Sequence, residues 1–90
     1  MAKETPQNLF LSVLVRDRNG ILFDGPASAV SSYNDRGPFD VLPLHENFIS
    51  LLNKEIVVRA REGEEKTIAV PSGVLSVREN RVEVYIGILK

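Results

Sequence analysis

Alternating hydrophobic and polar positions mark the start of the chain. Leu9, Leu11, Val13 and Val15 fall on one face of an extended segment. This period of two predicts an opening strand with one buried face. Asp-Arg-Asn-Gly follows at residues 17–20, and its Asn-Gly pair readily supplies the positive φ angles of a tight hairpin turn. Because residues 21–23 resume the apolar pattern, the first two strands are predicted to form a hairpin.

Two clusters of turn residues divide the next stretch. Asp-Gly-Pro at residues 24–26 predicts a break in regular structure, and residues 27–33 can form a strand of small residues. Asn-Asp-Arg-Gly-Pro at residues 34–38 is a dense turn signal. We expect this second cluster to protrude into solvent or toward a partner.

The second half repeats the period of two in consecutive short runs. Turn signals at residues 62–65, 71–73 and 79–80 separate these runs. Short strands, close turns and the lack of a long helical period predict an antiparallel sandwich or a flattened barrel. The alternating apolar positions are Ile56, Val58, Ala60, Ile68, Val70, Leu75, Val77, Val82, Val84 and Ile86.

One segment fits two structures. Leu44, Phe48, Leu51 and Leu52 have the i, i+4, i+7 and i+8 spacing of an amphipathic helix that follows Pro43. Short apolar stretches do not distinguish a helix from a strand by pattern alone. The local sequence therefore leaves helix and strand equally open for residues 44–52.

Composition narrows the classes of function. The 90 residues suffice for one domain, predicted over residues 9–90 after a flexible leader at residues 1–8. A net charge of -1 provides no broad basic field for a nucleic-acid backbone. The lack of cysteine and the single histidine exclude thiolate and two-histidine metal motifs. With no apolar run near the roughly 20 residues of a membrane span and no signal segment, the default location is the cytoplasm.

The single histidine is the first candidate for chemistry. His45 lies near Asp40 and Glu46, which could orient it as a general base or join it as metal ligands. We interpret it instead as a structural turn residue. The serines lack a recognisable base, and the glycines match neither the dinucleotide nor the P-loop pattern. We therefore predict no catalytic, cofactor or metal site.

A binding module is the alternative function. Tyr33, Phe39 and Tyr85 lie among arginines, as in small barrels that stack nucleic-acid bases. Acidic residues are interleaved with those arginines, so nucleic acid is the less favoured partner. An unpaired sheet edge could instead bind a peptide by strand addition. A free-standing sandwich or barrel that binds a peptide, a sugar or single-stranded nucleic acid thus stays open.

Three sequence blocks resemble a known family. They are Leu-Phe-Asp-Gly at residues 22–25, Gly-Pro-Phe-Asp-Val-Leu-Pro-Leu-His at 37–45 and Ser-Gly-Val-Leu-Ser-Val at 72–77. In this order and spacing they are similar to the amino-terminal domain of the ATP synthase epsilon subunit, called delta in mitochondria. The resemblance implies an all-β, flattened antiparallel sandwich of about ten short strands. It also favours a turn at residues 43–46 and a strand over about residues 48–52.

The sequence departs from the family pattern at several positions. Pro38 stands where the family has an acidic residue, and Asp40 and Leu44 replace glycines. Ser72 replaces the first glycine of a Ser-Gly-Gly turn, so we expect the positive φ that a glycine permits at Gly73 alone or elsewhere. The family commonly continues into a carboxy-terminal helical hairpin. Because this sequence ends at residue 90, we expect it to lack the functions of those helices.

The resemblance implies a non-catalytic rotor subunit of a proton-translocating F-type ATP synthase, without a cofactor. Such a subunit couples the gamma subunit to the c-ring at the cytoplasmic face of the inner, energy-transducing membrane. Because Pro38 replaces the usual acid, Asp35 or Arg36 is expected to make the polar ring contact. The family's ring-facing loop matches Asn34, Asp35, Arg36, Gly37 and Pro38, and its gamma-facing segment matches Leu42, Pro43, Leu44 and His45.

Overall fold

Seven strands make up the regular structure of residues 9–87, the part of the chain that the computed structural model describes. The predicted leader at residues 1–8 lies outside these residues. No described residue belongs to a helix long and apolar enough to cross a membrane. The strands are β1 (Leu11–Asp17), β2 (Gly20–Asn34), β3 (Gly37–Val41), β4 (Phe48–Ala60), β5 (Glu65–Ala69), β6 (Gly73–Arg78) and β7 (Arg81–Ile86).

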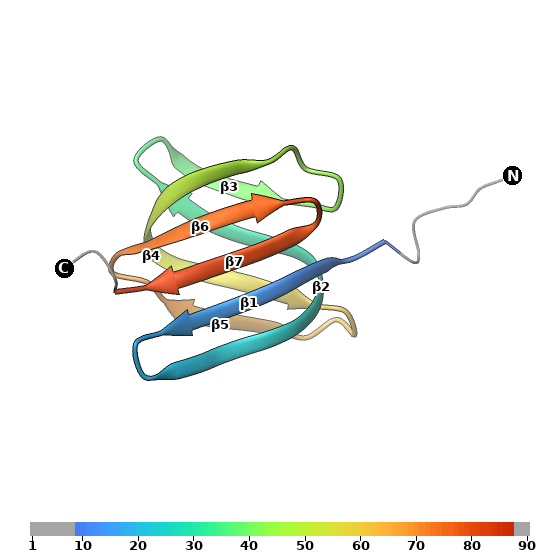
Figure 1. Ribbon diagram of the computed structural model, residues 1–90, viewed down its shortest axis with the longest axis horizontal. Coiled ribbons are helices and arrows are strands. Elements are labelled where there is room, and N and C mark those ends of the chain that lie inside the picture. Colours follow the sequence, from blue (N-terminus) through green and yellow to red (C-terminus); the bar gives the residue numbers. More distant parts are fainter. Residues whose placement is uncertain (1–8, 88–90) are drawn as a thin grey trace, which may run out of the picture.

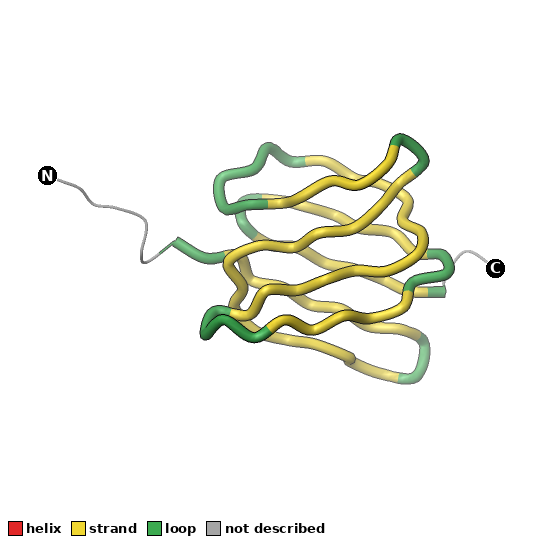
Figure 2. Tube along the Cα trace, turned by 180° about the vertical axis from the view of Figure 1, so that it is seen from behind, coloured by secondary structure: helices red, strands yellow, loops and turns green. Residues whose placement is uncertain are grey.

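The sheet curls into a closed barrel (Figure 1). Five strands are hydrogen-bonded neighbours in the order β2-β1-β7-β6-β4, and a further β2–β4 pairing closes the ring. β3 extends the sheet beyond β2, and β5 extends it beyond β4. The pairings are antiparallel apart from β1–β7, which is parallel. The view from behind shows the turns gathered at the two ends of the strands (Figure 2). The predicted all-β sandwich or barrel is confirmed.

Aliphatic side chains fill the barrel. The period of two at Val82, Val84 and Ile86 buries these residues, as predicted, and leaves Arg81 exposed on the other face. β7 lies between β1 and β6 in the sheet, and its buried face contributes to the core of the barrel. The hydrophobic core comprises Leu11, Val13, Val15, Ala27, Val30, Val41, Leu52, Ile56, Val58, Val70, Leu75, Val77, Val82, Val84 and Ile86.

The predicted break at residues 24–26 is wrong, because β2 continues through them. Pro26 lies opposite Ser12 of β1, and its carbonyl accepts a hydrogen bond from the Arg61 amide at 3.2 Å. The nitrogen and carbonyl of one strand residue point to the same side. The N–H that proline lacks would thus have faced the end of β4. Pro26 therefore removes no hydrogen bond from the β1–β2 ladder.

β4 is also one long strand, so residues 9–87 form seven strands and not about ten. Its first half, residues 48–52, pairs with β6, and its second half pairs with β2 and β5. Lys54, with a φ of 72°, lies where the strand passes from one set of neighbours to the other. The strand predicted from residue 48 is confirmed, and the helical alternative is excluded.

Two hairpin turns form where they were predicted, by different means. Glu79 and Asn80 have φ angles of 50° and 67°, as in a type I′ turn. At residues 17–20 the carboxylate of Asp17 accepts hydrogen bonds from the amides of Asn19 and Gly20, at 2.8 and 3.1 Å. Asn19 does not adopt the positive φ that the Asn-Gly pair predicts. The aspartate, two residues earlier, stabilises that turn.

Gly73 is required by packing and not by its φ angle. Neither Ser72 nor Gly73 has a positive φ. A Cβ on Gly73 would lie 2.9 Å from the carbonyl oxygen of Tyr85 and 3.0 Å from Val70 Cγ1. β6 and β7 can approach this closely because residue 73 has no side chain.

Truncation after Asn80 should unfold the domain. The deletion removes Val82, Val84 and Ile86, whose burial contributes about 1.5–3 kcal/mol each, from a fold with a total stability of roughly 5–10 kcal/mol. Circular dichroism and thermal melting measure the effect. The control, Glu83→Gln on the outward face of β7, should change stability by less than about 0.5 kcal/mol. A cooperative melt near the wild-type temperature in the truncated chain would contradict the assignment of β7 to the core.

Candidate partner-binding surfaces

The two predicted partner-binding segments lie at opposite ends of β3. Residues 34–38 form the hairpin that leads into this strand, and residues 42–45 form the turn that follows it. β3, with five residues at about 3.3 Å each, is roughly 16 Å long, and its first two residues belong to the hairpin segment. A single short strand thus connects both segments rigidly.

The hairpin between β2 and β3 has a two-residue tip. Asn34 pairs with Gly37, so Asp35 and Arg36 alone form the exposed turn, and Pro38 already lies in β3 opposite Tyr33. The Asn34 Oδ1 atom accepts a hydrogen bond from the Arg36 amide at 2.9 Å. The tip therefore protrudes, as predicted, with one acidic and one basic side chain at its end.

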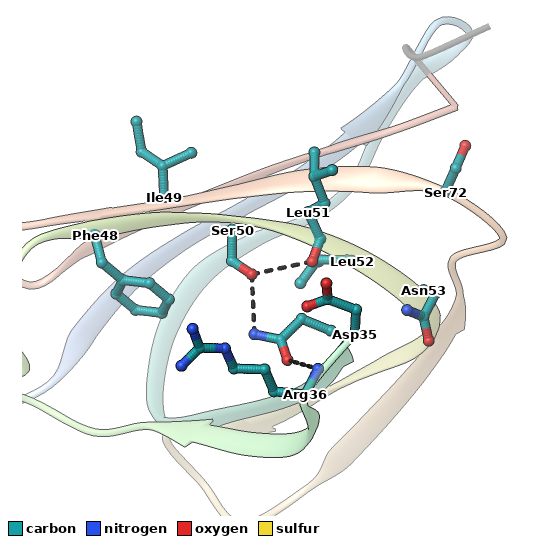
Figure 3. Close-up of a pocket in the computed structure, with 10 residues that line it drawn as sticks. Asp35, Arg36, Phe48, Ile49, Ser50, Leu51, Leu52, Asn53 and Ser72 are labelled. Atoms are coloured by element: carbon teal, nitrogen blue, oxygen red, sulfur yellow. Dashed lines mark hydrogen bonds between the residues drawn. The ribbon is translucent and has the colours of Figure 1, made fainter.

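An open slot separates this hairpin from the first half of β4 (Figure 3). It has a volume of about 670 Å³ and is lined by Asn34, Asp35 and Arg36 on the hairpin side, by residues 48–53 on β4, and by Ser72. Asn34 Nδ2 donates a hydrogen bond to Ser50 Oγ at 3.1 Å across the slot. The slot exists because the β2–β4 ladder ends at the Tyr33–Asn53 pair.

The segment at the other end of β3 is a tight turn. The His45 amide donates to the Leu42 carbonyl at 3.1 Å, which closes the turn around Pro43 and Leu44. Leu44 has a φ of 69°, a left-handed conformation that disfavours any residue with a Cβ. This is the position at which the sequence has leucine in place of the family's glycine. The Leu44 side chain is also 76% exposed.

Two asparagines clamp this turn to the β6–β7 hairpin. Asn80 Oδ1 accepts a hydrogen bond from the Leu44 amide at 2.6 Å, and Asn47 Oδ1 accepts one from the Glu79 amide at 3.0 Å. The Asn80 carbonyl in addition accepts a bond from the Ser12 amide at 2.8 Å. Each loop thus satisfies a backbone donor of the other loop. The clamp holds Leu44 in its strained conformation.

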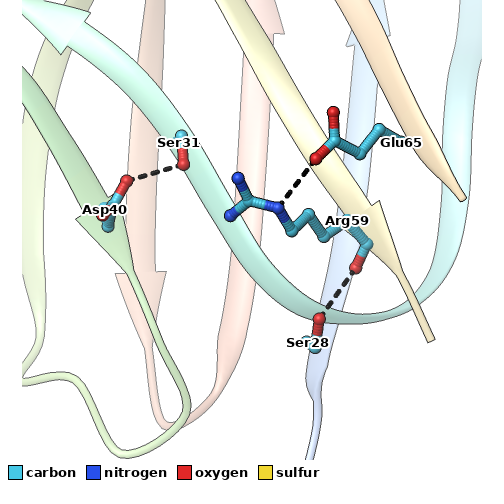
Figure 4. Close-up of polar contacts among 5 residues, drawn as sticks. All are labelled: Ser28, Ser31, Asp40, Arg59 and Glu65. Atoms are coloured by element: carbon cyan, nitrogen blue, oxygen red, sulfur yellow. Dashed lines mark hydrogen bonds and ion pairs between the residues drawn. The ribbon is translucent and has the colours of Figure 1, made fainter. Parts of the chain in front are cut away.

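The polar residues near His45 are not gathered into one site. The His45 ring nitrogen Nδ1 lies 2.8 Å from the Glu46 carbonyl, and the ring packs on Phe48 with centroids 4.9 Å apart. Asp40 instead accepts a hydrogen bond from Ser31 at 2.6 Å on the β2–β3 ladder (Figure 4). Within residues 9–87, no cluster of three or more His, Asp or Glu side chains is arranged to hold a metal ion.

The aromatic residues that suggested nucleic-acid binding do not share a surface. Phe39 packs against the core and contacts Phe48 edge to face, with ring centroids 5.9 Å apart. Tyr33 lies on β2 with the Lys54 ammonium 4.8 Å from its ring, and Tyr85 lies on β7. These positions offer no row of exposed rings on which bases could stack.

Two exposed apolar residues were missed by the sequence interpretation. Ile49 and Leu51, on the outward face of β4, are 74% and 63% exposed. They lie opposite Ser76 and Val74 of β6 and also border the slot. An apolar run of Phe-Ile-Ser-Leu-Leu in a strand must place apolar side chains on both faces. The run could have predicted these exposed side chains, but its spacing also fits an amphipathic helix with a single apolar face.

A model of the family described as "ATP synthase, Delta/Epsilon chain, beta-sandwich domain" matches residues 10–87 of the chain. The chain belongs to this family. The match includes both segments at the ends of β3. The nine-residue block at 37–45, with its departures at Pro38, Asp40 and Leu44, is therefore a variant of the delta/epsilon pattern.

Individual members of the delta/epsilon family agree with this assignment. The ATP synthase epsilon chains of Sulfurovum sp. and Corynebacterium urealyticum are 36% and 37% identical over 64 and 65 residues, which is 70% of this chain in both cases. The matches cover 50% and 52% of those proteins, so the chain spans about half the length of these relatives.

Solved structures share the fold at low sequence identity. A chain of the Euglena gracilis mitochondrial ATP synthase (OSCP/F1/c-ring) superposes with a TM-score of 0.80 at 17% identity, covering 87% of this chain and 51% of that one. A chain of the Tetrahymena thermophila mitochondrial ATP synthase central stalk and c-ring gives 0.68 at 16% identity, covering 84% and 62%.

Replacing Leu44 with glycine should stabilise the isolated chain. Glycine relieves a left-handed strain of about 1–2 kcal/mol and introduces an entropic penalty of about 0.5–1 kcal/mol, so a net gain of roughly 0.5–1 kcal/mol is expected. Leu42→Gly, at an exposed position without positive φ, is the matched control and should lower stability. Denaturant unfolding compares the two variants. Equal destabilisation by both would show that Leu44 is not strained.

Proposed function

We propose that this chain is a non-catalytic rotor subunit of an F-type ATP synthase that couples the gamma subunit to the c-ring. The observation that carries the proposal is the family match over residues 10–87, which includes both segments at the ends of β3. In this role the subunit associates with the membrane only indirectly, through the ATP synthase complex. We place it on the cytoplasmic face.

The architecture suits the transmission of torque. A closed barrel with an aliphatic core resists deformation, since close-packed interiors have low compressibility. The Asn47 and Asn80 clamp and the Asn34–Ser50 bond fix the loops at the two ends. A stiff body with a contact surface at each end can transmit force without a moving part of its own.

Each end has the chemistry that its proposed partner requires. The hairpin tip, with Asp35 and Arg36, suits the polar loops of the c-ring. The turn with Leu42 and Leu44 offers exposed apolar area at the other end, and Ile49 and Leu51 offer more on the outward face of β4 next to the slot. Apolar area of this kind suits the tighter contact with gamma. In this assignment Asp35 or Arg36 takes the role of the acidic residue that the family has at the position of Pro38.

Co-purification from the native cell tests the function directly. The chain, tagged at either end, should recover the gamma and c subunits from detergent-solubilised membranes. Recovery of a soluble peptide-binding complex without gamma would contradict the rotor assignment and favour the free-standing module.

Reversing both charges at the hairpin tip should weaken assembly without unfolding the domain. Asp35→Lys with Arg36→Glu conserves the net charge, and exposed positions change stability by less than about 0.5 kcal/mol. A central interface position can contribute more than about 1 kcal/mol to binding. Arg59→Glu with Glu65→Arg is the matched control, because it reverses the exposed ion pair of 2.9 Å between β4 and β5 (Figure 4). If the tip variant binds the purified rotor as the wild type does, the tip is not the contact.

Replacing Ile49 and Leu51 with threonine should also weaken assembly. Threonine keeps the β-propensity of β4 but removes apolar contact area, so the melting temperature should change little while the affinity for gamma falls. Ser76→Thr, on the neighbouring strand, is the control for altered shape on this face. Isothermal titration with purified gamma subunit measures the change, and an unchanged affinity would exclude this face from the interface.

A further inference from the structure

We propose that Asn34 and Ser50 form a positioning pair that sets the orientation of the Asp35–Arg36 tip. The inference rests on the proposed function in one respect, because the orientation of the tip affects binding only if the tip contacts the c-ring. The hydrogen bonds from which it is argued do not depend on any partner. Asn34 lies at the end of β2, and Ser50 lies in the first half of β4 on the far side of the slot.

The pair acts where the regular ladder has ended. Ser32 Oγ donates to the Glu55 carbonyl at 2.7 Å, and Tyr33 pairs with Asn53 as the last residues of the β2–β4 register. Beyond them β4 turns to pair with β6, and the hairpin leaves the barrel wall. Among the described residues, the Asn34–Ser50 bond of 3.1 Å is the one hydrogen bond between residues 34–36 and residues 48–52 of β4.

The two side chains satisfy each other in only one arrangement. Ser50 Oγ donates its single hydrogen to the Leu51 carbonyl at 3.0 Å, so toward Asn34 it can only accept. The Asn34 amide must therefore present its NH₂ group to Ser50. Its Oδ1 atom is then directed to the Arg36 amide, at 2.9 Å. One amide side chain thus connects the β4 backbone, through Ser50, to the backbone of the tip.

This chain of bonds determines how the tip charges point. Figure 3 shows Arg36 directed back along the slot toward the Phe48 end, while Asp35 lies nearer to Leu52. Without the Ser50 tether, the hairpin would still be anchored by the β2–β4 pairs up to Tyr33 and by the contact between Phe39 and Phe48. Asn34 would still cap the turn locally, but the two-residue tip would no longer be hydrogen-bonded to β4 across the slot.

Four variants and one control separate the tether from the turn. Ser50→Ala removes the tether and leaves the Asn34–Arg36 bond, and Asn34→Ala removes both bonds. Asn34→Ala with Ser50→Ala closes a double-mutant cycle, and Ser50→Thr restores the hydroxyl in a residue that suits a strand. Ser28→Ala is the matched control, since Ser28 Oγ also bonds a β4 carbonyl, that of Arg59 at 3.4 Å, away from the tip (Figure 4).

Two readouts are needed on the full chain. Amide hydrogen exchange at Arg36 in the free protein reports the tip itself, and binding to a purified complex of gamma and the c-ring reports its use. Ser50→Ala should raise the exchange rate and weaken binding by about twofold to tenfold. Ser50→Thr should restore both, Ser28→Ala should alter neither, and the double variant should be no worse than Asn34→Ala.

The outcomes distinguish this inference from the proposed function. Wild-type exchange at Arg36 in Ser50→Ala, or a failure of Ser50→Thr to restore it, would overturn the positioning pair. So would altered exchange with unchanged binding, if the charge-reversed tip still binds weakly. Altered exchange together with full binding by the charge-reversed tip would support the pair and overturn the ring contact.

Discussion

The β2–β4 pairing is the interaction on which the rest of the structure depends, because it turns a seven-stranded sheet into a closed barrel. Closure requires both long strands to change neighbours along their length. Register shifts at Ala27/Ala29 and Ser31/Tyr33, and the left-handed φ of Lys54, allow that change. At this irregular stretch the buried Ser32 hydroxyl satisfies the Glu55 carbonyl, which would otherwise carry a desolvation penalty.

The position of this closure also determines where the candidate surfaces lie. Once the ladder ends at Tyr33 and Asn53, the two strands diverge, and the slot and the protruding hairpin are the direct result. At the other end of β3, a turn has to return the chain to β4, and the clamp of Asn47 and Asn80 holds it against the β6–β7 hairpin. Both surfaces are therefore consequences of the barrel's connectivity, and side-chain hydrogen bonds give each a fixed orientation.

Local features of the fold could be predicted from the sequence, and non-local ones could not. Alternation assigned the buried face of β7 correctly, because the face of a strand residue depends only on its neighbours in the chain. The parallel β1–β7 pair, the continuity of β2 through Pro26 and the exposure of Ile49 depend on which strand lies alongside, and periodicity does not encode that. The hairpin at residues 34–38 was located by its turn residues. Its tether to Ser50 was not, since 16 residues separate the partners.

The strand edges of the barrel differ in how well they are protected against pairing with another chain, and the unprotected edge is the one next to the candidate binding surface. β3 and β5 are each hydrogen-bonded on one side, and they carry Pro38 and Lys66, residue types that discourage pairing with another chain. The first half of β4 also pairs on one side only, with β6, but its Phe-Ile-Ser-Leu-Leu run contains neither proline nor charge. Exposure of such a run favours self-association in a free chain. A partner that covers Ile49 and Leu51 prevents this self-association. Solubility of the isolated chain therefore favours polar side chains at these two positions, whereas affinity for the proposed rotor favours apolar ones.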